Sequence, residues 1–564
     1  MTRVRARWVA VLWALFFSAI ALVRIGGTYR LNSACFDEPA HIAASVELLD
    51  KATYTIDTVH PPLSRWTIGI PLYLSGLRYP AIIPTNLTKN YDTGNVILYE
   101  SGDPQHTLTL ARMGVLPFFL LGVFVVFCWT RQEYGDFAAV VAVALFTSSP
   151  VVLAFSCIAY TDMAAGATQA ACLFALVVWL RQRTTRSSIL LGISVGLACL
   201  AKFTAAIFLP AAALAILAIH RLAAHNSRNN HKRAATLLIA QFAIVLCVTV
   251  MIVWGGYRFS TGHLREAMQL PVGATKFLTL PTHIRSFAVK VADWNPVIPA
   301  PGLLNGLSTA WHLNQAAPRS YLLGKMKRGG WWYFYPVALT VKSPIPFLVL
   351  ALVGFIAPFR LVRPRQWTAL APMVSVIAVL VASTVVNTYV GVRHVMVVFP
   401  LLSIVAGDGG SYLWRSRRSL HGMPAFVLAT LLIWQGVSSF RARRDFIAYF
   451  NELAGRDPSR VLVEGCDLDC GQDLIRLADE LRARDVSHLE LAVWTSADMS
   501  RMGLPEFTLP QPYTPTHGWL AISMRSLRAG DLFHREYPPD AFEWLSHYQP
   551  VKKVGSTIWL YYLP

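Results

Sequence analysis

Long apolar segments recur along this chain and alternate with short polar or basic stretches. A helix of about 20 apolar residues is long enough to cross a bilayer, and the pattern predicts about eleven such spans. We expect the first span to be a retained signal anchor. The predicted spans lie near residues 8–25, 108–130, 137–156, 162–180, 188–201, 203–220, 236–255, 333–357, 367–386, 395–413 and 424–440.

Beyond residue 440 the pattern changes to short apolar runs that alternate with amphipathic stretches. "GQDLIRLADELRARD" and "DAFEWLSHY" are typical of helices. We expect strands at "SRVLVEG", "HLELAVW", "GWLAISMRSL" and "STIWLYYL". The sequence therefore predicts a transmembrane domain over 1–440 and a small α/β domain over 441–564.

Composition and charge agree with a polytopic membrane protein. The chain has 564 residues, of which 54% are hydrophobic and 14% are charged, with a net charge of +19. The basic residues gather in short loops between spans, which is the positive-inside pattern and not that of a nucleic-acid-binding surface. These clusters are Arg3, Arg5 and Arg7; Arg181, Arg183 and Arg186; Arg221, Arg228, Lys232 and Arg233; Arg360, Arg363 and Arg365; and Arg415, Arg417 and Arg418.

The same charge pattern predicts the topology. With eleven spans, all five basic clusters lie on the cytoplasmic side. The loops near 26–107 and 256–332 and the tail 441–564 then lie outside. We expect a multi-pass protein of the plasma (inner) membrane with an extracytoplasmic active site and C-terminal domain.

An unusual group of polar residues follows the first span in "ACFDEPAHIAA". Pro39 suits the first turn of a helix, so Asp37 and Glu38 lie at a helix N-terminus. A cap or a partner for the helix dipole needs one carboxylate. Two carboxylates followed by His41 exceed that need and favour a functional site.

Other candidate residues lie at the predicted outer ends of spans. His60 precedes two prolines in "TVHPPLSRW", where a rigid loop is the plain alternative. Asp162 stands at the start of a span, and two interpretations are open for it: a functional acid or a helix N-cap. On the same predicted side lie two cations, Lys202 and Arg393, and the imidazole of His394. Snorkelling to the interface and binding of a lipid phosphate are the two interpretations for the cations.

The segment "GCDLDCGQD" contains a "DLD" that resembles the metal-binding DxD of nucleotide-sugar transferases. Its predicted place outside the cell argues against that role. Cys466 and Cys470 could form a disulfide in an oxidising compartment, although their spacing does not guarantee the geometry.

The order of these motifs resembles a known superfamily. "FDEPAHIAASVELL" followed by "HPPLSRW" resembles the first outer loop of protein O-mannosyltransferase-like, polyprenol-phosphate-dependent glycosyltransferases, which have the GT-C fold and include the lipid A aminoarabinose transferases. "ARMGVLPFFLLGV", "TDMAAGA", "GLACLAKFTAAIFLP", "SYLLGKMKRGGWWYFYPVALTVKSPIPF", "GVRHVMVVFPLLS" and "YFNELAG" resemble the phospholipid carrier-dependent branch. The tail departs from that branch, in which a Ser and a Trp usually stand at the positions of Cys466 and Cys470.

The resemblance implies roles for these residues. Asp37 would be the catalytic base, with Glu38 beside it, and Asp162 would position the donor or the acceptor. Lys202 and Arg393 would hold the lipid phosphate, and His60 stands at the family's HPP position. His41 and His394 complete the set of expected substrate-binding residues.

These roles predict transfer from a polyprenyl-phosphate sugar to a hydroxyl of a glycan, lipid or protein acceptor. A carboxylate takes the acceptor proton and cations stabilise the departing phosphate, which favours single displacement with inversion. A retaining route through a glycosyl-enzyme stays open. A divalent metal on Asp37, Glu38, His41 and His60 is a further open alternative, because carboxylate and imidazole suit such ions.

Two other functional classes compete with the enzyme. A transporter or flippase of a sugar-linked lipid should show inverted repeats and charges near mid-membrane. The sequence shows neither, and its charged candidates lie at span ends. A catalytically inactive scaffold would not need the acidic residues Asp37 and Asp162.

Overall fold

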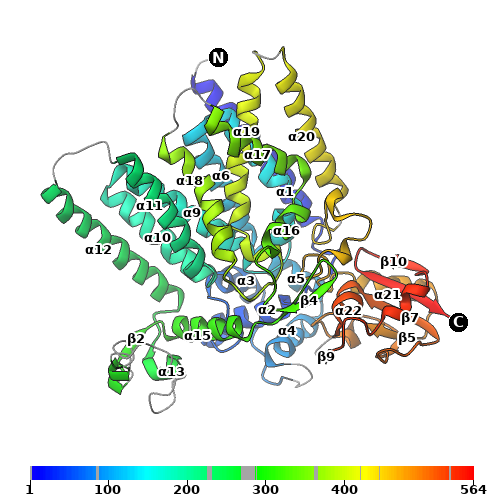
Figure 1. Cartoon of the computed structure of the whole chain (residues 1–564). Helices are drawn as coiled ribbons and strands as arrows, with labels where there is room; N and C mark the ends of the chain where they lie inside the picture. Colours follow the sequence, from blue (N-terminus) through cyan, green and yellow to red (C-terminus); the bar gives the residue numbers. More distant parts are fainter. Residues whose placement is uncertain are drawn as a thin grey trace.

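The computed structural model describes residues 3–83, 88–224, 231–268, 293–360, 366–418, 421–443, 445–532 and 535–564, with four positions between 286 and 291. Arg228, Arg363, Arg365 and much of the predicted outer loop 256–332 lie outside these residues. Figure 1 shows a bundle of long helices, with the sheet of the tail packed against one of its ends.

Every predicted span is helical. Pro150 and Pro344 accompany breaks in two of them, because proline cannot donate to the helix hydrogen-bond ladder. The helices are α1 (Arg3–Gly26), α5 (Pro104–Met113) with α6 (Leu116–Tyr134), α7 (Asp136–Ser148) with α8 (Pro150–Ser156), α9 (Asp162–Gln182), α10 (Thr185–Ala201), α11 (Ala205–Ala224), α12 (His231–Gly256), α16 (Phe334–Lys342) with α17 (Ile345–Arg360), α18 (Trp367–Ser383), α19 (Val398–Ser416) and α20 (Met423–Arg441).

Several of these helices are suited to a bilayer. Within the described residues, six are long and apolar enough to cross it, or up to eight if each bent pair is one span. The pairs α7–α8 and α16–α17 bend by 61° and 119°, so the segments predicted as spans at 137–156 and 333–357 each consist of two helices with a break between them. On α12, Ile239, Phe242 and Met251 are exposed apolar side chains. The chain is an integral membrane protein, and the number of spans stays a prediction.

Short elements cover one end of the bundle, at the bottom of Figure 1. The helix predicted after Asp37 is present, and a π-helical turn (Glu47–Lys51) extends it. The elements at this end are α2 (Glu38–Val46), α3 (Leu63–Leu74), α4 (Lys89–Glu100), α13 (Leu264–Met268), α15 (Pro301–Ala316), the strand pairs β1 (Thr261–His263) with β2 (Val297–Pro299) and β3 (Arg319–Leu322) with β4 (Lys325–Arg328), and the 3-10 helix η3 (Val392–Val395).

The tail forms a mixed sheet of five strands in the order β10-β11-β7-β5-β6. β5 runs parallel to β6 and β7, and the other pairings are antiparallel. The predicted α/β character is confirmed. The elements are α21 (Leu474–Ala483), β5 (His488–Ala492), β6 (Glu506–Thr508), β7 (Gly518–Ser523), α22 (Met524–Ala529), β8 (Asp531–Leu532) with β9 (Arg535–Glu536), β10 (Lys552–Val554), β11 (Ile558–Leu563) and the 3-10 turns Glu452–Ala454, Pro458–Arg460, Met499–Arg501 and Glu543–His547.

Two local predictions for the tail are wrong. "SRVLVEG" is not a strand, because Glu464 turns to accept the amide hydrogen of Tyr321 on β3 at 2.6 Å and to pair with Arg525 at 3.2 Å. "DAFEWLSHY" forms a short 3-10 helix instead of an α-helix. In both stretches tertiary contacts override the local apolar pattern.

The tail packs directly on the segment that leads into α2. The amide of Ser33 donates to the carbonyl of Gln472 at 3.1 Å, and that of Phe36 to the carbonyl of Cys470 at 2.9 Å. The Phe36 ring stacks on Trp494 with a centroid distance of 4.0 Å. The tail therefore forms part of the wall around Asp37.

Candidate active site

Asp37 directly precedes α2 and lies at the meeting point of several elements. Its carboxylate makes no capping hydrogen bond to the helix, so Asp37 is not a hydrogen-bonded N-cap. Oδ2 instead accepts a hydrogen bond from Nη1 of Arg393 at 3.0 Å, and the Asp37 amide donates to the hydroxyl of Tyr160 at 2.8 Å. The side chain is 23% exposed, so an approaching molecule can reach it.

Two further charged residues continue from this pair. Nη1 of Arg393 lies 3.8 Å from Oδ2 of Asp162, whose Oδ1 lies 2.5 Å from Nζ of Lys202. Asp162 is the first residue of α9, and Lys202 caps the C-terminus of α10. The reactive cluster, as we call Asp37, Arg393, Asp162 and Lys202, thus alternates in charge, which is what allows ions to be largely buried.

Arg393 is held by both the cluster and the tail. Burial alone would lower the pKa of Arg393, but Asp37 and Asp162 outweigh it and raise that pKa above its ordinary value. Its Nε donates to the carbonyl of Val390 at 3.0 Å. The carboxylate of Asp467 in the tail accepts the amide hydrogen of the preceding Val392 at 3.0 Å. The guanidinium is therefore fixed from two sides.

Glu38 points away from the reactive cluster. Its carboxylate accepts from Nε and Nη2 of Arg112 at 2.8 and 2.7 Å, and from the amides of Cys35 and Ala159, both at 2.8 Å. The side chain is fully buried. With both oxygens bound twice, Glu38 ties the start of α2 to α5 and to the loop before α9. The structure does not bring it together with Asp162, Lys202 or Arg393.

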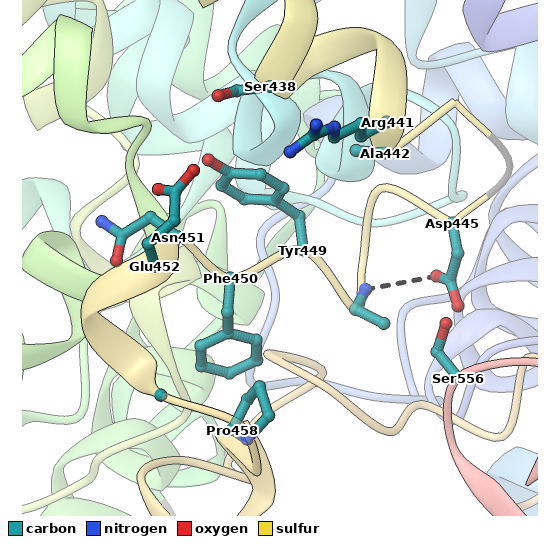
Figure 2. A pocket seen from close by; sticks show the side chains of 12 residues that line it. Ser438, Arg441, Ala442, Asp445, Tyr449, Phe450, Asn451, Glu452, Pro458 and Ser556 are labelled. Atoms are coloured by element: carbon teal, nitrogen blue, oxygen red, sulfur yellow. Dashed lines mark hydrogen bonds between the residues drawn. The ribbon is translucent and has the colours of Figure 1, made fainter.

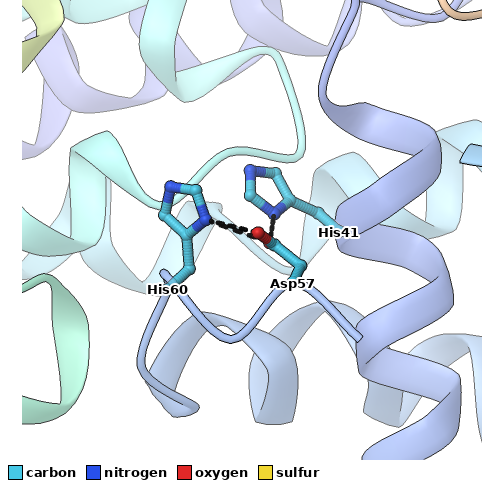
Figure 3. Close-up of side chains that lie close together, drawn as sticks. All are labelled: His41, Asp57 and His60. Atoms are coloured by element: carbon cyan, nitrogen blue, oxygen red, sulfur yellow. Dashed lines mark hydrogen bonds and ion pairs between the residues drawn. The ribbon is translucent and has the colours of Figure 1, made fainter. Parts of the chain in front are cut away.

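His41 and His60 meet at a residue that the sequence did not indicate. Nδ1 of His41 lies 3.1 Å from Oδ2 of Asp57, and Nδ1 of His60 lies 2.9 Å from its Oδ1 (Figure 3). Burial lowers the pKa of His60, although Asp57 opposes that shift. Asp57 has a φ of 51°, a left-handed conformation. No local sequence pattern predicts a left-handed acidic residue three positions before "HPP".

His394 lies outside the two groups. Its Nδ1 is 2.9 Å from the hydroxyl of Tyr335 and 3.2 Å from the carbonyl of Thr388. Burial, followed by the charge of Lys202, lowers the pKa of His394 to about 3, so its ring is neutral at neutral pH. The predicted binding role for His394 stays a prediction.

Two tyrosines near Asp37 were not among the candidates. Burial raises the pKa of Tyr91, and the charge of Asp37 adds to that rise, so its phenol stays protonated. The hydroxyl of Tyr160 lies 3.3 and 3.4 Å from the sulfurs of Cys466 and Cys470, which form a disulfide. Tyr160 stands two positions before Asp162, which was its only signal in the sequence.

The "DLD" acids of the tail are engaged within the protein. Asp467 binds the amide of Val392, and Asp469 accepts the amides of Gly471 and Arg525, both at 3.1 Å. Burial raises the pKa of Asp469 to about 6 and that of Asp467 to about 7. The two side chains hold neighbouring segments in place.

A cavity of about 500 Å³ lies elsewhere, beyond the C-terminus of α20 (Figure 2). Arg441, Asp445, Tyr449 and Glu452 line it, with Ser556 from the tail. None of the predicted site residues lines this cavity, and it does not define the candidate active site.

Comparisons with known proteins agree with the predicted fold. Residues 106–254 match the family model described as dolichyl-phosphate-mannose-protein mannosyltransferase. No curated protein matches the sequence. The apo structure of ArnT from Cupriavidus metallidurans is similar at 14% identity and a TM-score of 0.50, covering 98% of each chain.

Two further solved structures are similar at lower scores. ArnT of the same organism bound to undecaprenyl phosphate has 14% identity and a TM-score of 0.49, with 97% of this chain and 98% of that chain covered. The oligosaccharyltransferase AglB from Archaeoglobus fulgidus, in complex with an inhibitory peptide and a dolichol-phosphate, has 12% identity and a TM-score of 0.46, with 92% and 70% covered. The predicted GT-C fold is confirmed by the likeness to apo ArnT.

Proposed function

We propose that this protein is a membrane glycosyltransferase that moves a sugar from a polyprenyl-phosphate donor to an acceptor hydroxyl. The family model that matches residues 106–254 describes enzymes with a lipid-phosphate-linked sugar donor. The observation that carries the proposal is the reactive cluster, which joins an accessible carboxylate to two cations at one end of the helix bundle. The acceptor would be a glycan, a lipid or a protein.

Asp37 is the proposed general base. An acceptor hydroxyl needs to lose its proton as the anomeric carbon is attacked, and a carboxylate within hydrogen-bond reach can take it. Asp37 is the acid of the cluster that solvent reaches, since Asp162 is only 1% exposed. Single displacement from the face opposite the phosphate would invert the anomeric configuration.

Lys202 and Arg393 are the proposed ligands of the donor phosphate. The bond to the sugar breaks as negative charge grows on the phosphate, and fixed cations stabilise that charge without reorganisation. Asp162 holds Lys202 and lies near Arg393, so it orients both cations. This arrangement needs no separate acid for the leaving group.

The pairing of Arg393 with Asp37 links the two parts of the proposed site. Nη1 of Arg393 lies 3.0 Å from Oδ2 of Asp37. A donor phosphate bound to Arg393 would therefore lie next to the proposed base.

We place the reaction on the extracytoplasmic side of the plasma (inner) membrane. The basic clusters between spans favour this topology. The reactive cluster lies at the bundle end where α2 and the tail meet (Figure 1). The proposed division is a catalytic domain over 1–440 and an extracytoplasmic domain over 441–564, with the tail supplying part of the site wall.

The test follows release of lipid phosphate from a radiolabelled polyprenyl-phosphate sugar by the full chain in detergent. Asp37→Asn removes the base at nearly constant shape and should lower turnover by roughly 10²- to 10⁴-fold. His488→Gln, an exposed strand residue, is the matched control and should turn over as wild type.

Two outcomes would contradict the proposal. Equal turnover by Asp37→Asn and wild type would remove Asp37 as the base. Transfer of the intact sugar lipid across a vesicle bilayer, without release of lipid phosphate from any donor and acceptor, would favour a flippase.

A further inference from the structure

A second group of polar side chains lies beside the reactive cluster. Asp57 stands between the Nδ1 atoms of His41 and His60, at 3.1 Å from one and 2.9 Å from the other (Figure 3). One ligand atom from each residue lies within 4.8 Å of the other two. We call these three residues the His–Asp–His triad. Its members come from α2 and from the loop before α3.

With both imidazoles neutral, the triad carries one negative charge that no cation among the described residues matches. In the reactive cluster Asp37 and Asp162 are matched by Arg393 and Lys202. The carboxylate of Asp57 instead faces two imidazoles, which are neutral in the form that binds metal. A buried carboxylate without a cation is costly, and a bound cation would remove that cost.

The nearby arginine does not neutralise Asp57 directly. Arg65 donates to the backbone carbonyls of Asp57 and His60, at 2.5 and 3.0 Å, and its guanidinium lies 4.0 Å from the centroid of the Tyr54 ring. These contacts fix the loop that carries two of the three ligands.

We propose that His41, Asp57 and His60 bind one divalent transition-metal ion, of the class of Zn²⁺ or Mn²⁺. A set of two imidazoles and one carboxylate suits such ions better than it suits Mg²⁺ or Ca²⁺. The spacing of the nitrogen and oxygen atoms fits an edge of a coordination shell with metal–ligand distances of about 2.1 Å.

The triad is also partly open. The side chains of His41, Asp57 and His60 are 5%, 10% and 23% exposed. Three protein ligands with one side open to solvent leave a coordination position for water or a substrate oxygen, as catalytic metal sites do. A purely structural ion would be enclosed by four ligands.

The triad touches the reactive cluster through Tyr160. The His41 ring meets the Tyr160 ring edge-on with a centroid distance of 5.4 Å, and the Tyr160 hydroxyl accepts the amide hydrogen of Asp37. The next step rests on the proposed function. In that function, the ion adds two positive charges beside the site of an anionic lipid phosphate. Metal binding itself can be measured without any turnover.

The experiment uses the full chain in detergent, with any affinity tag removed and metal stripped by a chelator. Zn²⁺ and Mn²⁺ are titrated separately, with metal content by elemental mass spectrometry and stability by thermal unfolding. Wild type should take up about one ion and unfold at a higher temperature when loaded. Asp57→Asn and His60→Gln should weaken binding by more than the roughly 10- to 100-fold that loss of an outer-sphere partner costs.

Two variants keep the test decisive. His60→Cys supplies a thiolate ligand, so its Co²⁺ complex should show a sulfur-to-metal charge-transfer band that wild type lacks. His488→Gln lies outside the triad and should bind metal as wild type. Wild type without a stoichiometric ion, or Asp57→Asn that binds as tightly as wild type, would overturn the proposal. In that case the triad is a hydrogen-bonded cluster that orients His60. A metal-loaded protein without glycosyl transfer would overturn only the proposed function.

Discussion

Asp37 and Glu38 are neighbours in the chain, but their carboxylates lie in opposite environments. Glu38 is fully buried and accepts four hydrogen bonds, two from Arg112 and two from backbone amides. Asp37 is 23% exposed and pairs with Arg393 at the edge of the reactive cluster. One peptide bond therefore separates an anchoring acid from an accessible one.

The difference shows how burial separates structural from reactive groups. A carboxylate with every acceptor site used cannot take a proton from a substrate without losing a protein contact. Asp37 keeps part of its surface open, and its partner Arg393 also contacts a second acid. Glu38 fixes the backbone that presents Asp37, the proposed base.

Removing the charge of the buried acid Glu38 should have the largest effect on stability. Glu38→Gln keeps the size of the side chain but leaves the buried Arg112 charge unpaired, which costs about 3–5 kcal/mol. Thermal unfolding in detergent should show a large drop in the midpoint. Asp37→Asn is the matched variant and should lose less stability, because Arg393 keeps Asp162 as a second partner at 3.8 Å. If both variants lose the same stability, the contrast between the two acids is wrong.

A smaller effect is expected where the tail supports Arg393. Gly391 has a φ of +82°, and a Cβ there would lie 2.6 Å from Oδ2 of Asp467. Gly391→Ala should cost about 1–3 kcal/mol through strain and should lower turnover by moving Arg393. Gly436→Ala in α20 is the control, because its Cβ would meet nothing within 4 Å. Unchanged turnover in Gly391→Ala would show that the tail does not position Arg393.

Asp467 is a second buried carboxylate, and its effect on stability should depend on pH. It is buried too, but its carboxylate accepts a backbone amide hydrogen instead of pairing with an arginine. Burial raises the pKa of Asp467 from 3.8 to about 7. The folded state then binds this proton more tightly than the unfolded state, so the contribution to stability is full below pH about 4 and is lost as pH rises through about 7.

As pH rises between these two values, the wild type should therefore lose stability relative to Asp467→Asn. Thermal unfolding of both proteins across the range measures the difference. A difference that grows with pH would mean that Asp467 is ionised and paired in the folded protein.

The smallest effect is expected at an exposed ion pair. Arg482 and Asp479 are 2.9 Å apart on α21 and are 66% and 67% exposed. Arg482→Ala should change the free energy of unfolding by no more than about 0.5 kcal/mol, because solvent screens such pairs. A loss as large as that of Glu38→Gln would mean that burial does not explain the ranking of the ion pairs.

Much of the fold could be predicted because it depends on composition along the chain. Each predicted span forms one or two helices, and α21, β5, β7 and β11 appear where periodicity placed them. The failures in the tail have tertiary causes. The stretch before Cys466 turns because Glu464 binds Tyr321 and Arg525.

The candidate site was predicted less completely. Asp37, Asp162, Lys202 and Arg393 were singled out by charge at span ends, and the structure brings them into contact. The sequence could not say that Arg393 pairs with the acids, nor that Asp57 joins His41 to His60. Those facts depend on segments hundreds of positions apart or on a single left-handed residue.

Apolar length and charge are local properties, so the sequence alone predicts a helical membrane protein with acids and cations at the ends of its spans. Which of the two neighbouring carboxylates stays accessible depends on the tertiary structure. Asp37 and Glu38 have the same charge and neighbouring positions, and only the packing of α5, η3 and the tail around α2 separates them. Solvent access and hydrogen-bond partners come from that packing, and they set what each acid can do.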